Sequence, residues 1–259
     1  MIPLKKLLRE RRVTIGTWIQ APHPAIVEVL ANAGYDWIAL ECEHSENDVR
    51  DFAVMARAAA ATEAAPMVRV RENDPLVIRR MLDMGAEGVI VPLIHSAEDA
   101  RRAVQAARFP PDGVRGFSFS RMNDWGVGFE EYLATANERI AVIPMIESKE
   151  SVEQIDAIVA VEGVDGVFIG PYDLSGSYGI PGQTDHPTIL EARAKVVEAC
   201  RKAGKSAGLH VVIATEDAIA RAVADGFNFI AIASDIIILN EASRRTLETA
   251  RKAVSAQSS

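Results

Sequence analysis

Two acidic residues each stand just after a short apolar run, a position from which a carboxylate can bind a ligand. Asp173 follows the apolar run 166–169 and a Gly-Pro pair, and Glu147 follows the apolar run 141–146. Runs of β-branched and aromatic residues of this length are typical of buried strands, and Gly-Pro ends a strand. Carboxylates at the ends of two consecutive parallel strands can share one metal ion.

Other polar residues occupy comparable positions. Glu41 and His44 follow the apolar run 36–40, and Arg69 lies inside the run 67–70. An arginine in a strand is costly to bury alone, so it either forms a salt bridge or holds an anion. Acids, an arginine and a histidine at one mouth indicate a divalent metal, an anionic substrate and a general base.

Each of these residues also has an ordinary structural interpretation. Glu147 can be a carboxylate at a helix N-terminus, where the helix dipole favours negative charge. Asp173 can be the N-cap of a short turn, and His44 can be a solvated histidine in a polar loop. The residues gain weight as a set because all of them follow predicted strands.

Eight apolar segments are predicted strands, and helical segments separate most of them. The predicted strands span residues 14–18, 36–40, 67–70, 88–91, 141–146, 166–169, 206–211 and 229–232. Helical periodicity covers 24–33, 49–61, 75–84 and 215–224. Glycines 34, 85 and 226 each end a helix just before a strand. This alternation, in a chain of 259 residues, predicts a single (β/α)₈ TIM barrel, α/β in class, as one domain.

One long segment breaks the alternation. Residues 93–139 contain one predicted helix and then an irregular stretch, 109–126, that is too long for a plain connection. We interpret this stretch as an active-site loop or an interface element. At the two ends, the first residues predict a short amphipathic helix, and the polar tail 255–259 is expected to be flexible.

Composition excludes several classes of function. The net charge of −8 offers no basic surface for nucleic acid. Two cysteines, Cys42 and Cys200, are too few for a disulfide framework or a four-ligand zinc site. No apolar run approaches the roughly 20 residues of a membrane span, and no signal peptide precedes the first strand. We therefore expect a cytoplasmic protein with reduced cysteines that binds neither nucleic acid nor membranes.

Seven segments together resemble the HpcH/HpaI family of metal-dependent pyruvate aldolases. The similarity runs from about residue 12 to residue 241. The segments are Glu41-Cys42-Glu43-His44, Val68-Arg69-Val70, Met81-Leu82-Asp83-Met84-Gly85, 92–101, 109–116, Ile146-Glu147-Ser148 and 161–175. The resemblance implies a (β/α)₈ barrel, a hexamer of two trimers, and reversible cleavage of 4-hydroxy-2-oxo acids to pyruvate and an aldehyde through a metal-bound enolate.

The resemblance also implies roles for single residues. Glu147 and Asp173 become ligands of Mg²⁺, Mn²⁺ or Co²⁺, ions that accept a shell of oxygen ligands. Arg69 contacts the keto-acid oxygen, and His44 is the base, acting through a bridging or metal-bound water. The remaining residues with implied roles are Glu41, which supports His44, Asp83, which completes a neighbour's site, and the substrate-contacting Gly170, Pro171, Tyr172 and His210.

Four departures from the family pattern bear on specificity. Glu41 replaces the family's aspartate, and Cys42 replaces a glycine. Tyr172 narrows the mouth where some relatives have alanine, and His210 replaces an aliphatic residue near the acceptor side. None removes a metal ligand or the base. The departures leave open which aldehyde is accepted.

Other functions remain open at this point. A Schiff-base aldolase is disfavoured because the strand 166–169 carries no lysine. An acyl-CoA lyase would need a basic surface, for which Arg115 and Arg121 are the nearby candidates. Oxaloacetate decarboxylation would use the same site, and the last alternative is a barrel that binds a keto acid without turnover.

Overall fold

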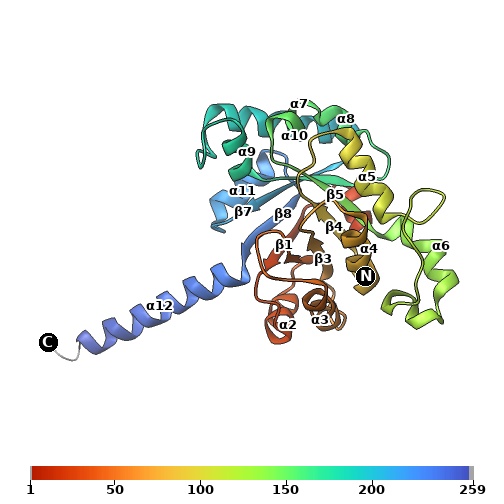
Figure 1. The fold of residues 1–259 in the computed structure, drawn as a ribbon. Coiled ribbons are helices and arrows are strands. Elements are labelled where there is room, and N and C mark those ends of the chain that lie inside the picture. Colours follow the sequence, from red (N-terminus) through yellow and green to blue (C-terminus); the bar gives the residue numbers. More distant parts are fainter. Residues whose placement is uncertain (1, 257–259) are drawn as a thin grey trace.

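The computed structural model describes residues 2–256, and its centre is a closed barrel of eight parallel strands in chain order (Figure 1). Each strand pairs with its sequence neighbours, and β1 closes the barrel on β8. The strands are β1 Thr14–Ile19, β2 Trp37–Glu41, β3 Ala65–Arg69, β4 Gly88–Val91, β5 Ala141–Ile146, β6 Gly166–Ile169, β7 Ser206–Val211 and β8 Phe229–Ser234. The predicted (β/α)₈ barrel is confirmed.

Helices alternate with the strands and surround most of the barrel. They are α1 Leu4–Arg9, α2 Pro24–Asn32, α3 Val49–Ala59, α4 Pro75–Met84, α5 Ala97–Ala107, η1 Arg121–Gly126, α6 Phe129–Arg139, α7 Lys149–Glu153, α8 Ile155–Val159, α9 Pro171–Ser177, α10 Pro187–Ala203, α11 Glu216–Ala224 and α12 Asp235–Ala256. Among the described residues, no helix combines the length and apolarity that a membrane span requires. The three glycines predicted to end helices, Gly34, Gly85 and Gly226, all have positive φ.

Large and small side chains alternate inside the barrel. A Cβ on Gly16 would come within 2.4 Å of the Trp37 ring, so only glycine leaves room for this indole. The N-terminal helix α1 closes one end of the barrel, where Leu4 and Leu8 join the interior cluster. The opposite, C-terminal end of the strands is where barrel enzymes keep their sites, and here it carries Glu41 and Arg69 at the ends of β2 and β3.

Strand boundaries differ from the prediction at the ends that matter most for the site. The structure extends β2 to Glu41 and ends β3 at Arg69, so these two residues face each other in the register of the sheet. β3 also begins two residues before the predicted start. Pro66 has no N–H, but its carbonyl accepts from the Glu87 N–H at 2.8 Å, so pairing continues through it.

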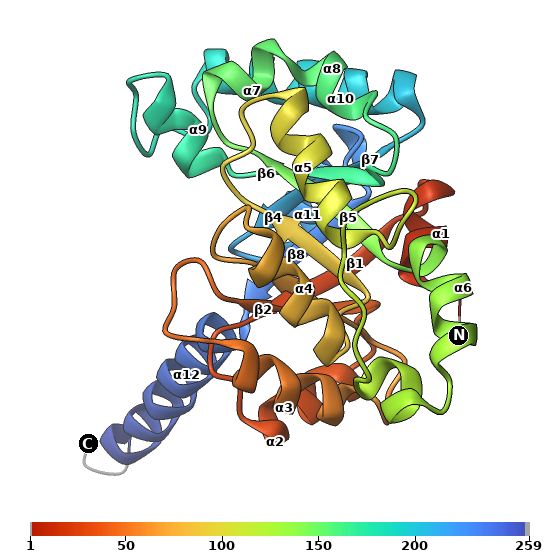
Figure 2. The same cartoon turned by 45° about the vertical axis from the view of Figure 1, so that its right-hand side comes forward.

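The segment 93–139 holds a second helix, α6, that was not predicted. Figure 2 shows α6 beside α1, at the closed end of the barrel. The irregular stretch lies there too, because Arg115 binds Asp83 at the last turn of α4 and Arg121 donates to the Ala56 carbonyl. The interpretation of this stretch as a loop of the chain's own active site is wrong.

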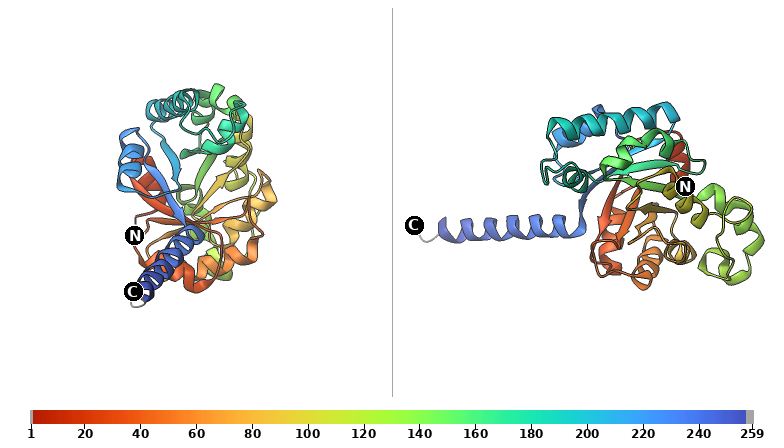
Figure 3. Two further views of the ribbon diagram at one scale, coloured as in Figure 1. Left: turned by 90° about the vertical axis from the view of Figure 1, so that its left-hand side faces the viewer. Right: turned by 45° about the horizontal axis from the view of Figure 1, so that its top comes forward.

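The C-terminal helix departs from the barrel. α12 contains 22 residues and projects away from the other helices (Figure 3). Of its side chains, only Asp235 is buried within the described part of the chain. Ser255 and Ala256, predicted as flexible tail, form the last turn of α12, whereas 257–259 lie outside the described residues.

Candidate active site

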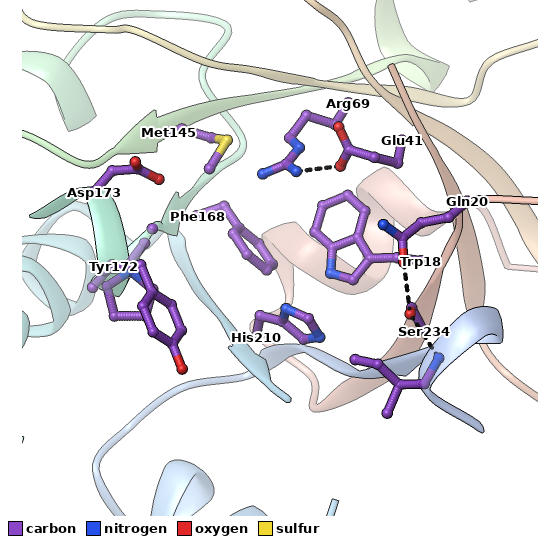
Figure 4. A pocket seen from close by; sticks show the side chains of 14 residues that line it. Trp18, Gln20, Glu41, Arg69, Met145, Phe168, Tyr172, Asp173, His210 and Ser234 are labelled. Atoms are coloured by element: carbon purple, nitrogen blue, oxygen red, sulfur yellow. Dashed lines mark hydrogen bonds and ion pairs between the residues drawn. The ribbon is translucent and has the colours of Figure 1, made fainter. Parts of the chain in front are cut away.

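A cavity of about 230 Å³ opens at the C-terminal ends of the strands (Figure 4). Its wall combines aromatic rings with a few charged groups. The lining residues are Trp18, Gln20, Glu41, Arg69, Met145, Phe168, Ile169, Gly170, Pro171, Tyr172, Asp173, His210, Ser234 and Ile237. A space of this size suits a small substrate, and the charged groups gather on one side of it.

Arg69 is held in the cavity by two carboxylates and a ring. Its guanidinium pairs with Glu41, lies 3.3 Å from the Glu43 carboxylate through Nε, and sits 5.0 Å from the centre of the Trp18 ring. The interpretation of Arg69 as a salt-bridged residue is confirmed, and Arg69 also lines the cavity; its binding of an anion stays a prediction. A guanidinium fixed in this way presents a defined positive charge to an anionic ligand.

The resemblance implied that Glu41 supports the His44 side chain, but in the structure it does not. Its Oε1 accepts the backbone N–H groups of Glu43 and His44 at 2.7 and 2.9 Å, and its Oε2 pairs with Arg69. The carboxylate nearest to the imidazole belongs to Glu43, whose Oε2 lies 3.6 Å from His44 Nε2. Glutamate at position 41 reaches the loop backbone and Arg69, which leaves neither oxygen free for the imidazole.

The two predicted metal ligands come from adjacent strands. Glu147 is buried behind Gly170, and its Oε1 accepts the Leu93 N–H at 2.6 Å. Leu93 takes a positive φ of 56° to present that N–H. Asp173 lies exposed in the first turn of α9 and lines the cavity. Burial raises the pKa of Glu147, the Leu93 N–H opposes this effect, and the charge of Asp173 adds to it.

The residues present fit a divalent cation. A Cβ at position 170 would lie 3.1 Å from Glu147 Oε2, so glycine keeps open the space in front of that oxygen. The charge of Asp173 adds to the rise in the pKa of Glu147, and a cation near both carboxylates would relieve that repulsion. Two carboxylates with room for water and substrate oxygens match the preference of Mg²⁺ or Mn²⁺. Within the described residues, no group of three or more acidic, histidine or cysteine ligands forms.

His44 and Asp83 lie outside the cavity wall. The His44 side chain is 62% exposed at the mouth, near enough to Glu147 to affect its pKa. Asp83 lies within the last turn of α4, at the closed end, where its carboxylate binds buried Arg115 at 2.7 Å. The structure therefore places His44 at the rim of the site and removes Asp83 from the cavity of its own chain.

Seven lining residues were missed by the sequence analysis, namely Trp18, Gln20, Met145, Phe168, Ile169, Ser234 and Ile237. Trp18, Gln20 and Ser234 follow or end β1 and β8. Trp18 closes a predicted strand at its C-terminal end, which is a usable signal, whereas Gln20 and Ser234 carry none. Gly170, Pro171, Tyr172 and His210 line the cavity as expected.

Glu43 provides a test of the buried charge by pH. Burial raises the pKa of this carboxyl to about 7; Arg69 opposes the shift and Glu147 adds to it. Between the ordinary value of 4.5 and about 7, the folded chain keeps a proton that the unfolded chain releases, so this group's contribution to stability falls as pH rises.

Urea unfolding in the presence of a metal chelator tests this effect. Over that pH window, Glu43→Gln should show a less negative slope of unfolding free energy against pH than the wild type. Glu46→Gln, an exposed neighbour, should keep the wild-type slope; equal slopes for all three proteins would contradict the burial of Glu43.

Comparison with known proteins places this geometry in a family. A family model described as HpcH/HpaI aldolase/citrate lyase matches residues 14–242. The chain is 36% identical over 249 residues to the 5-keto-4-deoxy-D-glucarate aldolase of Klebsiella pneumoniae, covering 96% of each. It is 38% identical over 247 residues to the 2-keto-3-deoxy-L-rhamnonate aldolase of Salmonella gallinarum, covering 93% of this chain and 90% of the relative.

Solved structures agree with the sequence comparisons. An HpcH/HpaI aldolase/citrate lyase family protein from Burkholderia cenocepacia superimposes with a TM-score of 0.90 at 36% identity, covering 96% of this chain and 98% of that one. The HpcH/HpaI aldolase from Desulfitobacterium hafniense gives a TM-score of 0.88 at 32% identity, covering 97% of each. The chain belongs to the HpcH/HpaI aldolase/citrate lyase family and is a carbon–carbon lyase.

Proposed function

We propose that this chain is a divalent-metal-dependent aldolase that reversibly cleaves 4-hydroxy-2-oxo acids to pyruvate and an aldehyde. The observation that carries the proposal is that Asp173 and the fixed guanidinium of Arg69 line one cavity, with the Glu147 carboxylate directly behind its lining residue Gly170. This arrangement binds a cation and a small anion side by side. A 2-oxo acid chelated by a cation presents both charges at once.

The names of the relatives support this substrate class. Two of them are aldolases of keto-deoxy sugar acids, and a third, from Roseobacter denitrificans, is a hydroxypyruvate/pyruvate aldolase that is 38% identical over 237 residues. Each of the three names describes an aldolase of a keto acid. We extend that reaction class to this chain because Glu41, Arg69 and Asp173, three of the charged residues on which the resemblance rests, line its cavity.

The residues divide the chemistry between them. When bound, a divalent cation polarises the keto group of the 2-oxo acid. Arg69 directs its guanidinium into the cavity and stabilises the negative charge that develops on the keto oxygen as the carbon–carbon bond breaks. His44, at the rim and 3.6 Å from Glu43, exchanges a proton with the substrate hydroxyl through water.

Two rival mechanisms find less support. The buried Lys5 has its pKa lowered to about 8, chiefly by burial, but it lies on α1 at the closed end and donates to the carbonyls of Asn137 and Ile140. It offers no amine to the cavity for a Schiff base. The basic surface that an acyl-CoA lyase needs is also weakened, because Arg115 is buried and bound to Asp83.

The metal ligands provide the first test of function. Glu147→Gln and Asp173→Asn should each abolish C3 proton exchange of pyruvate in D₂O, measured by NMR, because each removes a charged oxygen ligand. Titration calorimetry with Mn²⁺ should show lost binding in the same variants, while Glu150→Gln, on the exposed side of α7, should bind and exchange as wild type. Exchange by the wild type that persists in excess chelator would contradict the metal requirement.

The roles of His44 and Arg69 separate in steady-state kinetics. His44→Ala should lower kcat by about 10²–10⁴-fold while Mn²⁺ binding persists, because only proton transfer is lost. Arg69→Ala should raise KM for the keto acid and lower kcat together, because its charge meets the substrate and the transition state. His186→Ala, at the N-cap of α10, serves as the histidine control. A His44→Ala enzyme with wild-type kcat would make His44 a loop residue without a catalytic role.

We further propose that the protein is a homo-oligomer, a hexamer of two trimers, located in the cytoplasm. α12 carries exposed Ile236, Leu239 and Leu247 on one face and does not fold back on its own barrel (Figure 1). The stretch 109–126 adds exposed aromatic side chains, among them Phe119 and Trp125. Large apolar groups exposed on two separate elements support burial against further copies of the chain.

Asp83 belongs to the same proposal. Its carboxylate is held by Arg115 beside the exposed aromatic stretch, so an interface formed there would carry Asp83 toward a neighbouring chain. We therefore keep its predicted role in completing a neighbour's site as part of the oligomer proposal. The contribution of Asp83 depends on assembly.

Assembly can be tested through α12. Leu239→Asp combined with Leu247→Asp should shift the protein to smaller species in light scattering, because two charges enter the apolar face. Arg245→Asp combined with Thr249→Asp changes the opposite side of the same helix and should leave the hexamer intact. A wild-type monomer with full aldolase activity, or a hexamer unaffected by the leucine changes, would contradict the proposal.

A further inference from the structure

One wall of the cavity, formed by Trp18, His210 and Ser234, takes no part in the steps described above, although the resemblance implies that His210 contacts the substrate. Glu41, Arg69 and Asp173 come from β2, β3 and α9, whereas Trp18, His210 and Ser234 come from β1, β7 and β8. The first group holds the charges, and the second group offers neutral polar atoms among rings. If the keto acid occupies the charged side, the second side receives the aldehyde.

An irregularity in β8 shapes this second side. β8 pairs with β1 as Gly16↔Ala231 and Trp18↔Ser234, so two residues of β8 oppose one of β1. Such a bulge turns local backbone groups away from the ladder. Ala233 is in the bulge and takes a φ of 48°, a conformation that is unfavourable for an L-residue. In this conformation the Ala233 carbonyl lies within hydrogen-bond distance of His210, a residue of the cavity wall.

That carbonyl fixes the protonation state of His210. The distance from His210 Nε2 to the Ala233 oxygen is 2.9 Å, and a carbonyl only accepts hydrogen bonds, so Nε2 carries the proton. Burial lowers the pKa of His210, which keeps the ring neutral. Nδ1 is then a hydrogen-bond acceptor, and it has no hydrogen-bond partner within residues 2–256. The ring stands on the cavity wall beside Phe168 and Trp18 (Figure 4).

A matching donor lies on the same side. The Ser234 hydroxyl accepts from the Ile237 N–H at 3.3 Å and donates to Gln20 Oε1 at 3.0 Å. The oxygen of the Gln20 amide is therefore engaged, and its NH₂ group remains to donate. One acceptor and one donor on a single wall match a hydroxyl group, which both donates and accepts.

We propose that His210 selects aldehydes that carry a hydroxyl next to the carbonyl, because its Nδ1 accepts a hydrogen bond from that hydroxyl. This inference rests on the proposed aldolase function and names the substrate class of its second substrate. Aldehydes with an alkyl group in place of the hydroxyl leave Nδ1 desolvated without a partner. The Ala233 bulge makes the selection possible because it holds the ring in one tautomer.

The test compares two aldehydes of nearly equal size, glycolaldehyde and propionaldehyde, each condensed with pyruvate. The wild type should favour glycolaldehyde in kcat/KM. His210→Phe and His210→Leu should reduce this preference by about tenfold, because both remove the acceptor. His210→Asn should retain most of it, because the amide oxygen takes the place of Nδ1. A preference that is unchanged in the Phe and Leu variants overturns the proposal.

Two further measurements keep the outcomes distinct. Pyruvate C3 exchange in D₂O needs no aldehyde, so its absence in the wild type would reject the aldolase function. If the wild type catalyses the exchange but changes at His210 leave the aldehyde preference unaltered, only the role of His210 is rejected. The ¹⁵N shifts of the wild-type imidazole, assigned by comparison with His210→Asn, should report the Nε2–H tautomer near neutral pH. An Nδ1–H tautomer would overturn the proposal without reference to activity.

Discussion

Excess negative charge around one guanidinium is the constraint on which the site depends. Glu41, Glu43 and Glu147 are buried or nearly so, Asp173 stands at the mouth, and Arg69 is the cation that contacts two of them. Carboxylates so close together in a region of low dielectric destabilise one another's ionised forms. Burial raises the pKa values of Glu43 and Glu147, and the neighbouring carboxylates add to the rise. A divalent cation would balance the charge that Arg69 leaves uncompensated.

The barrel tolerates this arrangement because its two ends differ. At the closed end, α1 seals the interior with leucines, and Lys5 and Arg108 satisfy backbone carbonyls around Asp165. Arg115, at the same end, has two buried nitrogen atoms, Nε and Nη1, without a hydrogen bond in the described structure. At the open end, Glu43 Oε2 and Arg69 Nε are likewise buried without a hydrogen bond among the described residues. What distinguishes the open end is that Arg69 also lines a cavity that a small ligand can enter.

Much of the fold followed from the sequence, because each strand is short, apolar and bounded by glycine, proline or charge. The position of each carboxylate followed as well, since a residue after a strand can point only to the mouth of the barrel. The orientations of Glu41 and His44 did not follow. A single methylene decides whether a carboxylate reaches an imidazole or the backbone of its own loop, and no spacing rule resolves that choice. The Ala233 bulge was equally hidden, because an alanine gives no sign of a positive φ.

The long terminal helix has a consequence for how the chain unfolds. Most of the stability of a helix in a protein comes from the packing of one of its faces against other elements. α12 buries only its first residue against the described chain, whereas the barrel strands are buried almost throughout. The two parts therefore have separate sources of stability, and α12 can melt while the barrel remains folded. Unfolding of the whole chain is a two-state process only when α12 is packed against a surface. When α12 is not packed, a single free energy of unfolding describes the barrel alone.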